Sequence, residues 1–166
     1  AQELGRSRFG VKFVRISLDE MNYLRWIYPD SKFIILVRNP WDCWRSYKGY
    51  QWYYRWPKGL VKTPQQFGKI WEKQTSELIS HSLGDAVTVL RYEDFLRHEF
   101  SWDQLRSFTG LSNLSSIALE KKIVGVTSAP KPIVESDCEI IGSICGSLAN
   151  TLGYHGLKNT DLSLSI

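Results

Sequence analysis

The stretch KFIILVRNPWDCWRSY, residues 32–47, constrains the fold more than any other part of the chain. Its apolar run Phe33–Val37 is rich in β-branched and aromatic side chains, which predicts a short buried strand. Arg38 follows this run directly. Pro40 suits the first turn of a helix, because proline lacks the backbone N–H that this turn would leave unpaired. The stretch therefore predicts a strand that passes at once into a helix, with an arginine at the junction.

Two other runs, residues 11–16 and 86–90, have the same strand-like composition. Helices are predicted between the three strands: one over residues 18–28, a second from Pro40 to residue 53, and a third from the Thr63-Pro64 pair to residue 83. This βαβαβ order predicts an α/β fold in which a mostly parallel sheet is flanked by helices.

The remainder of the chain is predicted to be helical. Capping-box patterns at residues 101–104 and 136–139 each predict a helix start, and the second helix is expected to end near Gly153. With 166 residues, of which 43% are hydrophobic, the chain has material for one core. We therefore expect one domain over residues 1–156 and a loose tail over residues 157–166.

The three cysteines do not indicate a disulfide framework. Cys138 and Cys145 share one predicted helix and lie about 10 Å apart along its axis, which is too far for a disulfide. We expect a reducing compartment and a cytoplasmic location, although a signal or anchor upstream of Ala1 would change this. No run approaches the ~20 apolar residues of a membrane segment, and the histidines and cysteines lack the spacing of a metal site.

Arg38 and Ser46 are the first candidate binding residues. Ligands of open parallel sheets bind beyond the carboxyl ends of the strands, where the next helix points its positive N-terminus. An arginine there suits an anion, and Ser46 would add a hydroxyl donor on the helix face that it shares with Asp42. The pair predicts a phosphate clamp. The alternative is a surface salt bridge for Arg38 and a solvated Ser46.

Three motifs together resemble the sulfotransferases that use 3′-phosphoadenosine 5′-phosphosulfate as donor. Arg-Asn-Pro-x-Asp with a serine eight residues after the arginine resembles their 3′-phosphate-binding motif. Val89-Leu-Arg-Tyr-Glu-Asp-Phe95 resembles the strand that ends in Tyr-Glu-Asp, and Leu152-Gly-Tyr154 resembles the closing Leu-Gly-Tyr of several branches. The resemblance implies a P-loop-NTPase-like sulfotransferase fold and transfer of a sulfonate group to a hydroxyl or amine of an acceptor, such as a carbohydrate or a protein.

The resemblance also implies roles for single residues. Arg38 and Ser46 would hold the 3′-phosphate of the donor, and Tyr92 would approach the adenine. Lys12, in the first predicted strand, would stabilise the transferring sulfonate; the alternative is a lysine whose head group reaches solvent at a strand end.

A late loop supplies the remaining candidates. Thr127-Ser-Ala-Pro-Lys-Pro132 resembles the loop that closes over the nucleotide in the tyrosylprotein branch. Ser128 and Lys131 would therefore contact the donor, and the alternative is a plain proline-stiffened loop.

One family feature is absent from the sequence. No Gly-Thr or Gly-Ser phosphosulfate-binding loop precedes Val11 or occurs elsewhere, and none of the acids before Arg38 fits the catalytic base. We expect the chain to be the C-terminal part of a sulfotransferase domain, and an inactive chain is one of the alternatives.

The segment YKGYQWYYRW, residues 47–56, interleaves aromatic and basic side chains. It is expected to form a wall of the acceptor site, or else part of the core. Together with the chain's net charge of +4, this segment leaves open a non-catalytic binding module for glycan or nucleic acid. The charge density of the chain does not by itself predict a nucleic acid partner. A nucleotide kinase would require a Walker-type lysine loop, which the sequence lacks.

Overall fold

The computed structural model describes residues 8–49, 61–80, 84–97, 99–112 and 132–155. The chain divides into two compact units, residues 1–31 and residues 32–166. The single domain expected over residues 1–156 stays a prediction, and the tail expected at 157–166 lies outside the described residues.

The first unit contains one helix, α1 (Leu18–Ile27), among its described residues. Its start is fixed by a capping box. The Ser17 hydroxyl accepts a hydrogen bond from the Glu20 backbone N–H at 3.2 Å, and the Glu20 carboxylate accepts one from the Ser17 backbone N–H at 2.7 Å. Met21 is buried. The predicted helix at 18–28 is confirmed to within one residue.

The strand predicted at residues 11–16 is wrong, because this segment has no regular secondary structure. Its apolar side chains Val11, Phe13 and Val14 are 64%, 51% and 83% exposed. A strand needs a neighbour to pair its backbone N–H and C=O groups, and the described part of the first unit contains no second strand. Composition indicated strand propensity here, but composition does not show whether a run gains the backbone partners that a strand needs.

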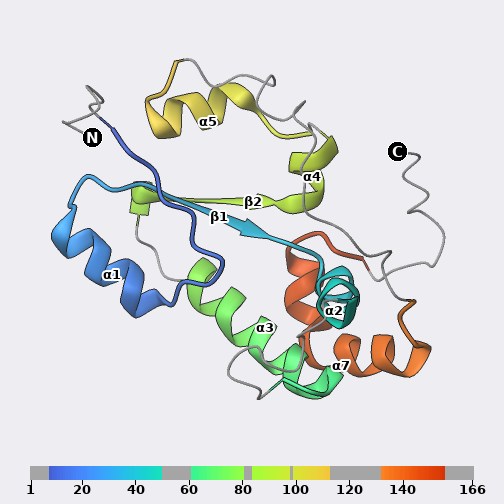
Figure 1. The fold of residues 1–166 in the computed structure, drawn as a ribbon. Coiled ribbons are helices and arrows are strands. Elements are labelled where there is room, and N and C mark those ends of the chain that lie inside the picture. The colour runs from blue at the N-terminus through green and yellow to red at the C-terminus, as the bar shows by residue number, and fades with distance from the viewer. Residues whose placement is uncertain (1–7, 50–60, 81–83, 98, 113–131, 156–166) are drawn as a thin grey trace. The chain divides into compact units, whose positions relative to one another are not determined.

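The second unit is built around a two-stranded parallel sheet of β1 (Phe33–Val37) and β2 (Val87–Arg91) (Figure 1). Phe33 pairs with Val87, and Val37 pairs with Arg91, so the two strands end at the same edge. The second and third predicted strands are confirmed, and the α/β class is confirmed in this coarse form: a small parallel sheet with helices.

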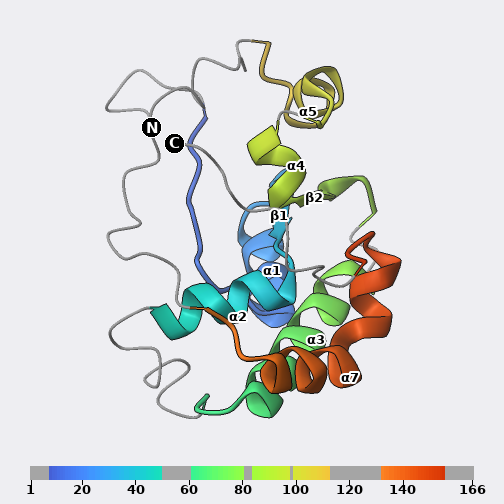
Figure 2. The ribbon, with the colours of Figure 1, turned by 90° about the vertical axis from the view of Figure 1, so that its right-hand side faces the viewer.

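Three helices of the second unit pack together: α2 (Pro40–Gly49), α3 (Pro64–Ser80) and α7 (Glu135–Thr151) (Figures 1 and 2). The Trp44 ring of α2 lies 5.3 Å from the Phe67 ring of α3. A Cβ at Gly68 would lie only 3.3 Å from the Ile144 side chain, so this glycine lets α3 and α7 approach closely. The core formed by these helices and β1 includes Ile35, Val37, Trp41, Trp44, Phe67, Trp71, Ile141, Cys145 and Ala149.

The described part of the second unit also contains three shorter elements: η3 (Gly84–Ala86), α4 (Tyr92–Arg97) and α5 (Trp102–Thr109). Ser101 caps α5 by accepting a hydrogen bond from the Gln104 backbone N–H at 3.2 Å, which confirms that predicted start. None of the helices in the described ranges combines the length and the apolar character that a membrane crossing requires.

The predicted capping box at residues 136–139 is wrong. Helix α7 begins at Glu135, its N-cap is Val134, and no side chain caps it, so Ser136 lies inside the first turn. The first turn is held by a tertiary contact instead, because the Asp137 carboxylate accepts hydrogen bonds from two side chains of α2.

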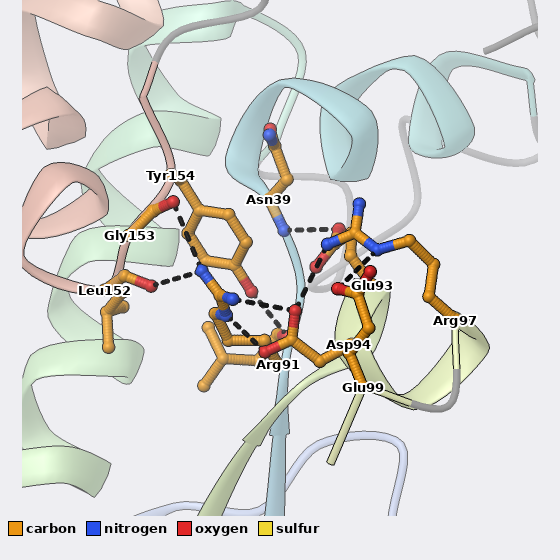
Figure 3. Close-up of polar contacts among 10 residues, drawn as sticks. Asn39, Arg91, Glu93, Asp94, Arg97, Glu99, Leu152, Gly153 and Tyr154 are labelled. Carbon is orange, nitrogen blue, oxygen red and sulfur yellow. Dashed lines mark hydrogen bonds and ion pairs between the residues drawn. The ribbon is translucent and has the colours of Figure 1, made fainter. Parts of the chain in front are cut away.

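The chain leaves α7 through Gly153, at the predicted end of the helix. Gly153 has φ = +81°, a conformation that disfavours residues with a Cβ. A Cβ at this position would also lie 2.5 Å from Nη1 of Arg91. Arg91 uses this proximity to donate hydrogen bonds to the carbonyl oxygens of Leu152 (3.5 Å) and Gly153 (3.3 Å) (Figure 3).

We predict that Gly153→Ala lowers the free energy of unfolding by about 1–3 kcal/mol, since it adds both backbone strain and a clash with Arg91. The matched control is Gly146→Ala within α7, where a Cβ meets no atom within 4 Å. This control should raise the free energy of unfolding by about 0.5–1 kcal/mol. Urea unfolding followed by circular dichroism measures both, and effects of the same sign would contradict the prediction.

Candidate functional site

The carboxyl end of β1 passes directly into the N-terminus of α2. Asn39 caps this helix, because its Oδ1 accepts hydrogen bonds from the backbone N–H groups of Trp41 (2.9 Å) and Asp42 (3.4 Å). Pro40 occupies the first helical position. The predicted helix start is therefore confirmed, and it places the positive end of the α2 dipole beside Arg38.

Two aromatic side chains hold the carbonyl groups at the tip of β1. The Tyr154 hydroxyl donates to the carbonyl oxygen of Val37 at 2.9 Å. The indole Nε1–H of Trp71, on α3, donates to the carbonyl oxygen of Arg38 at 3.1 Å. The ladder with β2 ends at Val37, so these contacts satisfy backbone groups at the end of the sheet.

A carboxylate holds the next backbone group. The N–H of Asn39 donates to Oε1 of Glu93, on α4, at 3.0 Å (Figure 3). Three consecutive residues of the strand tip, 37–39, thus each have a side-chain partner from a different part of the second unit. We call these three partners the strand-tip cradle: Trp71, Glu93 and Tyr154.

The structure brings the predicted site residues Arg38 and Tyr92 together. The Arg38 guanidinium carbon lies 4.9 Å from the centroid of the Tyr92 ring, which is a cation–π distance. Arg38 forms no ion pair with any acid in the described ranges, and its Nε is buried without a hydrogen-bond partner. Oε2 of Glu93 is buried without a partner as well. An unpaired buried donor on a cation suggests that a ligand completes the site.

The arginine at the tip of the other strand is fully engaged. Arg91 forms a bidentate pair with Asp94, at 2.6 and 2.7 Å (Figure 3). Arg97 donates to the same carboxylate at 3.2 Å and pairs with Glu99 at 2.8 Å. Hydrogen bonding to Asp94 raises the pKa of Arg91. The charge of Arg91 is therefore neutralised locally, which distinguishes Arg38 as the strand-tip cation that is available to an anion.

Ser46 and Lys12 are the two other predicted site residues that the structure describes. Ser46 lies on α2 with an exposed side chain. Asp42, expected on the same face, is buried and pairs with Arg45 at 2.6 Å. Lys12 is exposed in the irregular segment of the first unit, so the buried strand on which its prediction relied is not formed. Both roles stay predictions.

Other candidates fall partly or wholly outside the described residues. Ser128 and Lys131 are among them, as are residues 50–60 of the aromatic stretch. Tyr47, at its start, packs against the rings of Trp44 and Phe67 and donates its hydroxyl to the carbonyl oxygen of Val61 at 3.1 Å. Tyr47 therefore packs with the core, as one of the two alternatives for this stretch expected. The acceptor-site wall over the rest of the stretch stays a prediction.

Two cysteines of the second unit, Cys43 and Cys145, are poorly suited to nucleophilic chemistry. Burial raises the pKa of the Cys43 thiol to about 12, although the nearby Arg38 cation opposes the rise. Burial also raises the pKa of Cys145 to about 12. Both thiols are neutral near pH 7, and a thiol is a much weaker nucleophile than a thiolate. Within the described ranges, no three His, Cys, Asp or Glu residues gather in a way that could hold a metal ion.

Sequence reasoning missed the strand-tip cradle. Glu93 and Tyr154 lie in motifs that were recognised, yet no role was assigned to either. The sequence around Trp71 predicts only that it lies on a helix. Its hydrogen-bond partner is a backbone carbonyl 33 residues away, which local sequence does not reveal.

A second contact that was missed fixes the rotation of α2. The Asp137 carboxylate accepts hydrogen bonds from Nε1 of Trp44 at 2.8 Å and from Nζ of Lys48 at 2.9 Å. Partial burial raises the pKa of Asp137, but the hydrogen bonds from Trp44 and Lys48 outweigh it, so the pKa is lowered overall. The helix that follows Arg38 is thereby tied to α7.

We predict that Asn39→Ala lowers the free energy of unfolding by about 1 kcal/mol, because it removes the N-cap of α2. Asn150→Ala is the matched control, since Asn150 is exposed near the end of α7; its effect should stay within about 0.5 kcal/mol. Thermal and urea unfolding measure both variants, and equal effects would show that the cap does not stabilise the junction.

We predict that Asp137→Asn destabilises the protein by about 1–2 kcal/mol near pH 7, because it weakens charge-assisted hydrogen bonds. A carboxylate with a lowered pKa stabilises the fold above its ordinary pKa of 3.8 and loses this contribution as the pH falls below that value. The difference in unfolding free energy between wild type and variant should therefore shrink between pH 5 and pH 2.

Asp103→Asn is the control for this pH series, since the Asp103 side chain is 90% exposed. It should change stability little at either pH. A wild-type advantage over Asp137→Asn that grows on acidification would contradict the assigned role of Asp137.

No protein-family model, curated protein or solved structure matches the chain.

Proposed function

We propose that the strand tip of the second unit holds the 3′-phosphate and the adenine of 3′-phosphoadenosine 5′-phosphosulfate. The protein would then be a sulfotransferase with a P-loop-NTPase-like fold, acting on a hydroxyl or amine of an acceptor such as a carbohydrate or a protein. The observation that carries this proposal is the Arg38–Tyr92 pair at 4.9 Å, in which the buried Nε of Arg38 has no partner.

The chemistry of the pair fits a nucleotide phosphate. A guanidinium fork matches the oxygens of a phosphate, and an adjacent helix N-terminus favours negative charge. Tyr92 offers an aromatic face for a purine base. Arg38 and Tyr92 follow neighbouring strands at one edge of the sheet, the edge at which parallel α/β proteins bind ligands.

The proposed reaction is the attack of an acceptor hydroxyl or amine on the sulfur of the donor. A bond from the acceptor atom to sulfur forms, the bond from sulfur to the phosphate oxygen breaks, the proton of the acceptor group passes to a base or to water, and adenosine 3′,5′-bisphosphate leaves. Most of the rate enhancement would come from positioning and electrostatic stabilisation. In this proposal Arg38 and Tyr92 position the donor, and Ser46, Ser128 and Lys131 add contacts to it.

Nothing in the described part of the chain favours the alternative of a basic and aromatic binding module. Tyr47 is occupied in packing, and Lys48 is paired with Asp137 at 2.9 Å. Both side chains at the start of the aromatic stretch therefore have structural partners already.

We predict that adenosine 3′,5′-bisphosphate binds about 10–100-fold tighter than 5′-AMP, since an arginine–phosphate contact contributes about 1.5–3 kcal/mol. Arg38→Ala should remove this preference and leave the affinity for 5′-AMP nearly unchanged. Isothermal titration calorimetry measures both ligands. Lys73→Ala is the charge-matched control, because Lys73 is an exposed cation on α3.

Two results would overturn the proposal. One is equal affinity of the wild-type protein for the two nucleotides. The other is a preference that survives Arg38→Ala. A preference that falls equally in Lys73→Ala would show that net charge, and not the Arg38 site, attracts the phosphate.

A further inference from the structure

The three side chains of the strand-tip cradle bind the backbone next to Arg38, and the proposed donor contacts do not explain why they do so. Its members belong to three separate parts of the second unit: Trp71 to α3, Glu93 to α4, and Tyr154 to the segment after α7. None of them is among the residues proposed to touch the donor. All three converge on the backbone of residues 37–39.

This backbone needs external partners because it lies where the sheet ends. The ladder between β1 and β2 stops at the pair Val37 and Arg91. Past that pair, the backbone groups of residues 38 and 39 have no strand neighbour within the described part of the chain to accept or donate hydrogen bonds. Partners on both sides of Arg38 fix the direction in which its side chain leaves the chain, and a preorganised cation loses less freedom when it binds an anion.

Tyr154 is held in place by its own surroundings. It is 6% exposed, and the turn at Gly153 directly precedes it. Arg91 binds the carbonyl oxygens of the two residues before it, and the Arg91 guanidinium lies 5.9 Å from the Tyr154 ring (Figure 3). Burial and the nearby Glu93 carboxylate raise the pKa of Tyr154, so its hydroxyl keeps its proton and acts as a donor.

We propose that Tyr154 is a positioning residue for the anion site: its hydrogen bond to the Val37 carbonyl orients Arg38 for a 3′-phosphate. This inference rests on the proposed function, because it takes Arg38 as the phosphate ligand. It also gives the Leu152-Gly-Tyr154 motif a physical role. Leu152 and Gly153 offer carbonyls to Arg91, Gly153 makes the turn, and Tyr154 reaches the strand tip.

The test uses Tyr154→Phe in the full chain, which removes one hydroxyl and keeps the ring. Its preference for adenosine 3′,5′-bisphosphate over 5′-AMP should fall about 3–10-fold, with the affinity for 5′-AMP unchanged. Ile141→Val is the control, since it removes one buried methylene from α7 and leaves the hydrogen bond to Val37 intact. It should keep the full preference. This comparison separates positioning from a general loss of stability.

A second readout does not depend on the nucleotide. The Nε–H of Arg38 gives its own NMR signal, and in the ligand-free protein this signal should shift in Tyr154→Phe but not in Ile141→Val. A variant that keeps the full nucleotide preference and an unshifted Arg38 signal would overturn the inference while the proposed function stands.

The proposed function can fail separately. If the wild-type protein shows no preference between the two nucleotides, the phosphate assignment falls. The Arg38 signal then decides the remaining question alone: a shift in Tyr154→Phe supports the positioning of Arg38 by Tyr154, and an unchanged signal overturns it.

Discussion

The hydrogen bond from Tyr154 to the carbonyl of Val37 joins residues that are 117 positions apart. A two-stranded sheet is marginal by itself, so β1 and β2 depend on contacts from the helices around them. The strand-tip cradle supplies several of these contacts at one place, the edge where both strands end. The contacts that stabilise the sheet of the second unit therefore lie next to Arg38, the residue that follows β1. The fold and the candidate site depend on the same interactions.

The two strand-tip arginines show how the same residue type serves two purposes. Arg91 has a bidentate carboxylate partner and two backbone carbonyls, so its charge and its donors are used inside the structure. Arg38 has an aromatic ring in cation–π contact, and no acid in the described ranges pairs with it. A buried donor without a partner costs free energy. An Arg38 Nε in this state, on a backbone held on both sides, is consistent with the proposed anion site.

The parts of the fold that the sequence predicted are those that local signals determine. The apolar run Phe33–Val37 and the Pro40 helix start appeared at the predicted positions, because composition and proline geometry act within a few residues. The strand predicted at 11–16 did not form, and composition within these six residues does not show whether their backbone gains the partners that a strand needs. The predicted capping box at the start of α7 was wrong, and the first turn of this helix is held by Asp137, whose partners lie on α2. No pattern within residues 134–139 reveals these distant partners. The cradle was missed for the same reason, since each of its contacts joins distant parts of the chain.

The difference between local signals and long-range contacts also separates the two residues of the predicted phosphate clamp, Arg38 and Ser46. Ser46 was chosen by spacing, and six residues past Pro40 place it about 9 Å along the axis of α2. The rotation of α2 is fixed by the buried Trp41 and Trp44, and Ser46 follows Trp44 by two residues, so it points away from that buried face. Arg38, in contrast, is adjacent to backbone contacts from three separate elements. A position that several long-range contacts fix is a stronger basis for a binding role than a position inferred from helix spacing, so the proposed anion site is expected to depend on Arg38 more than on Ser46.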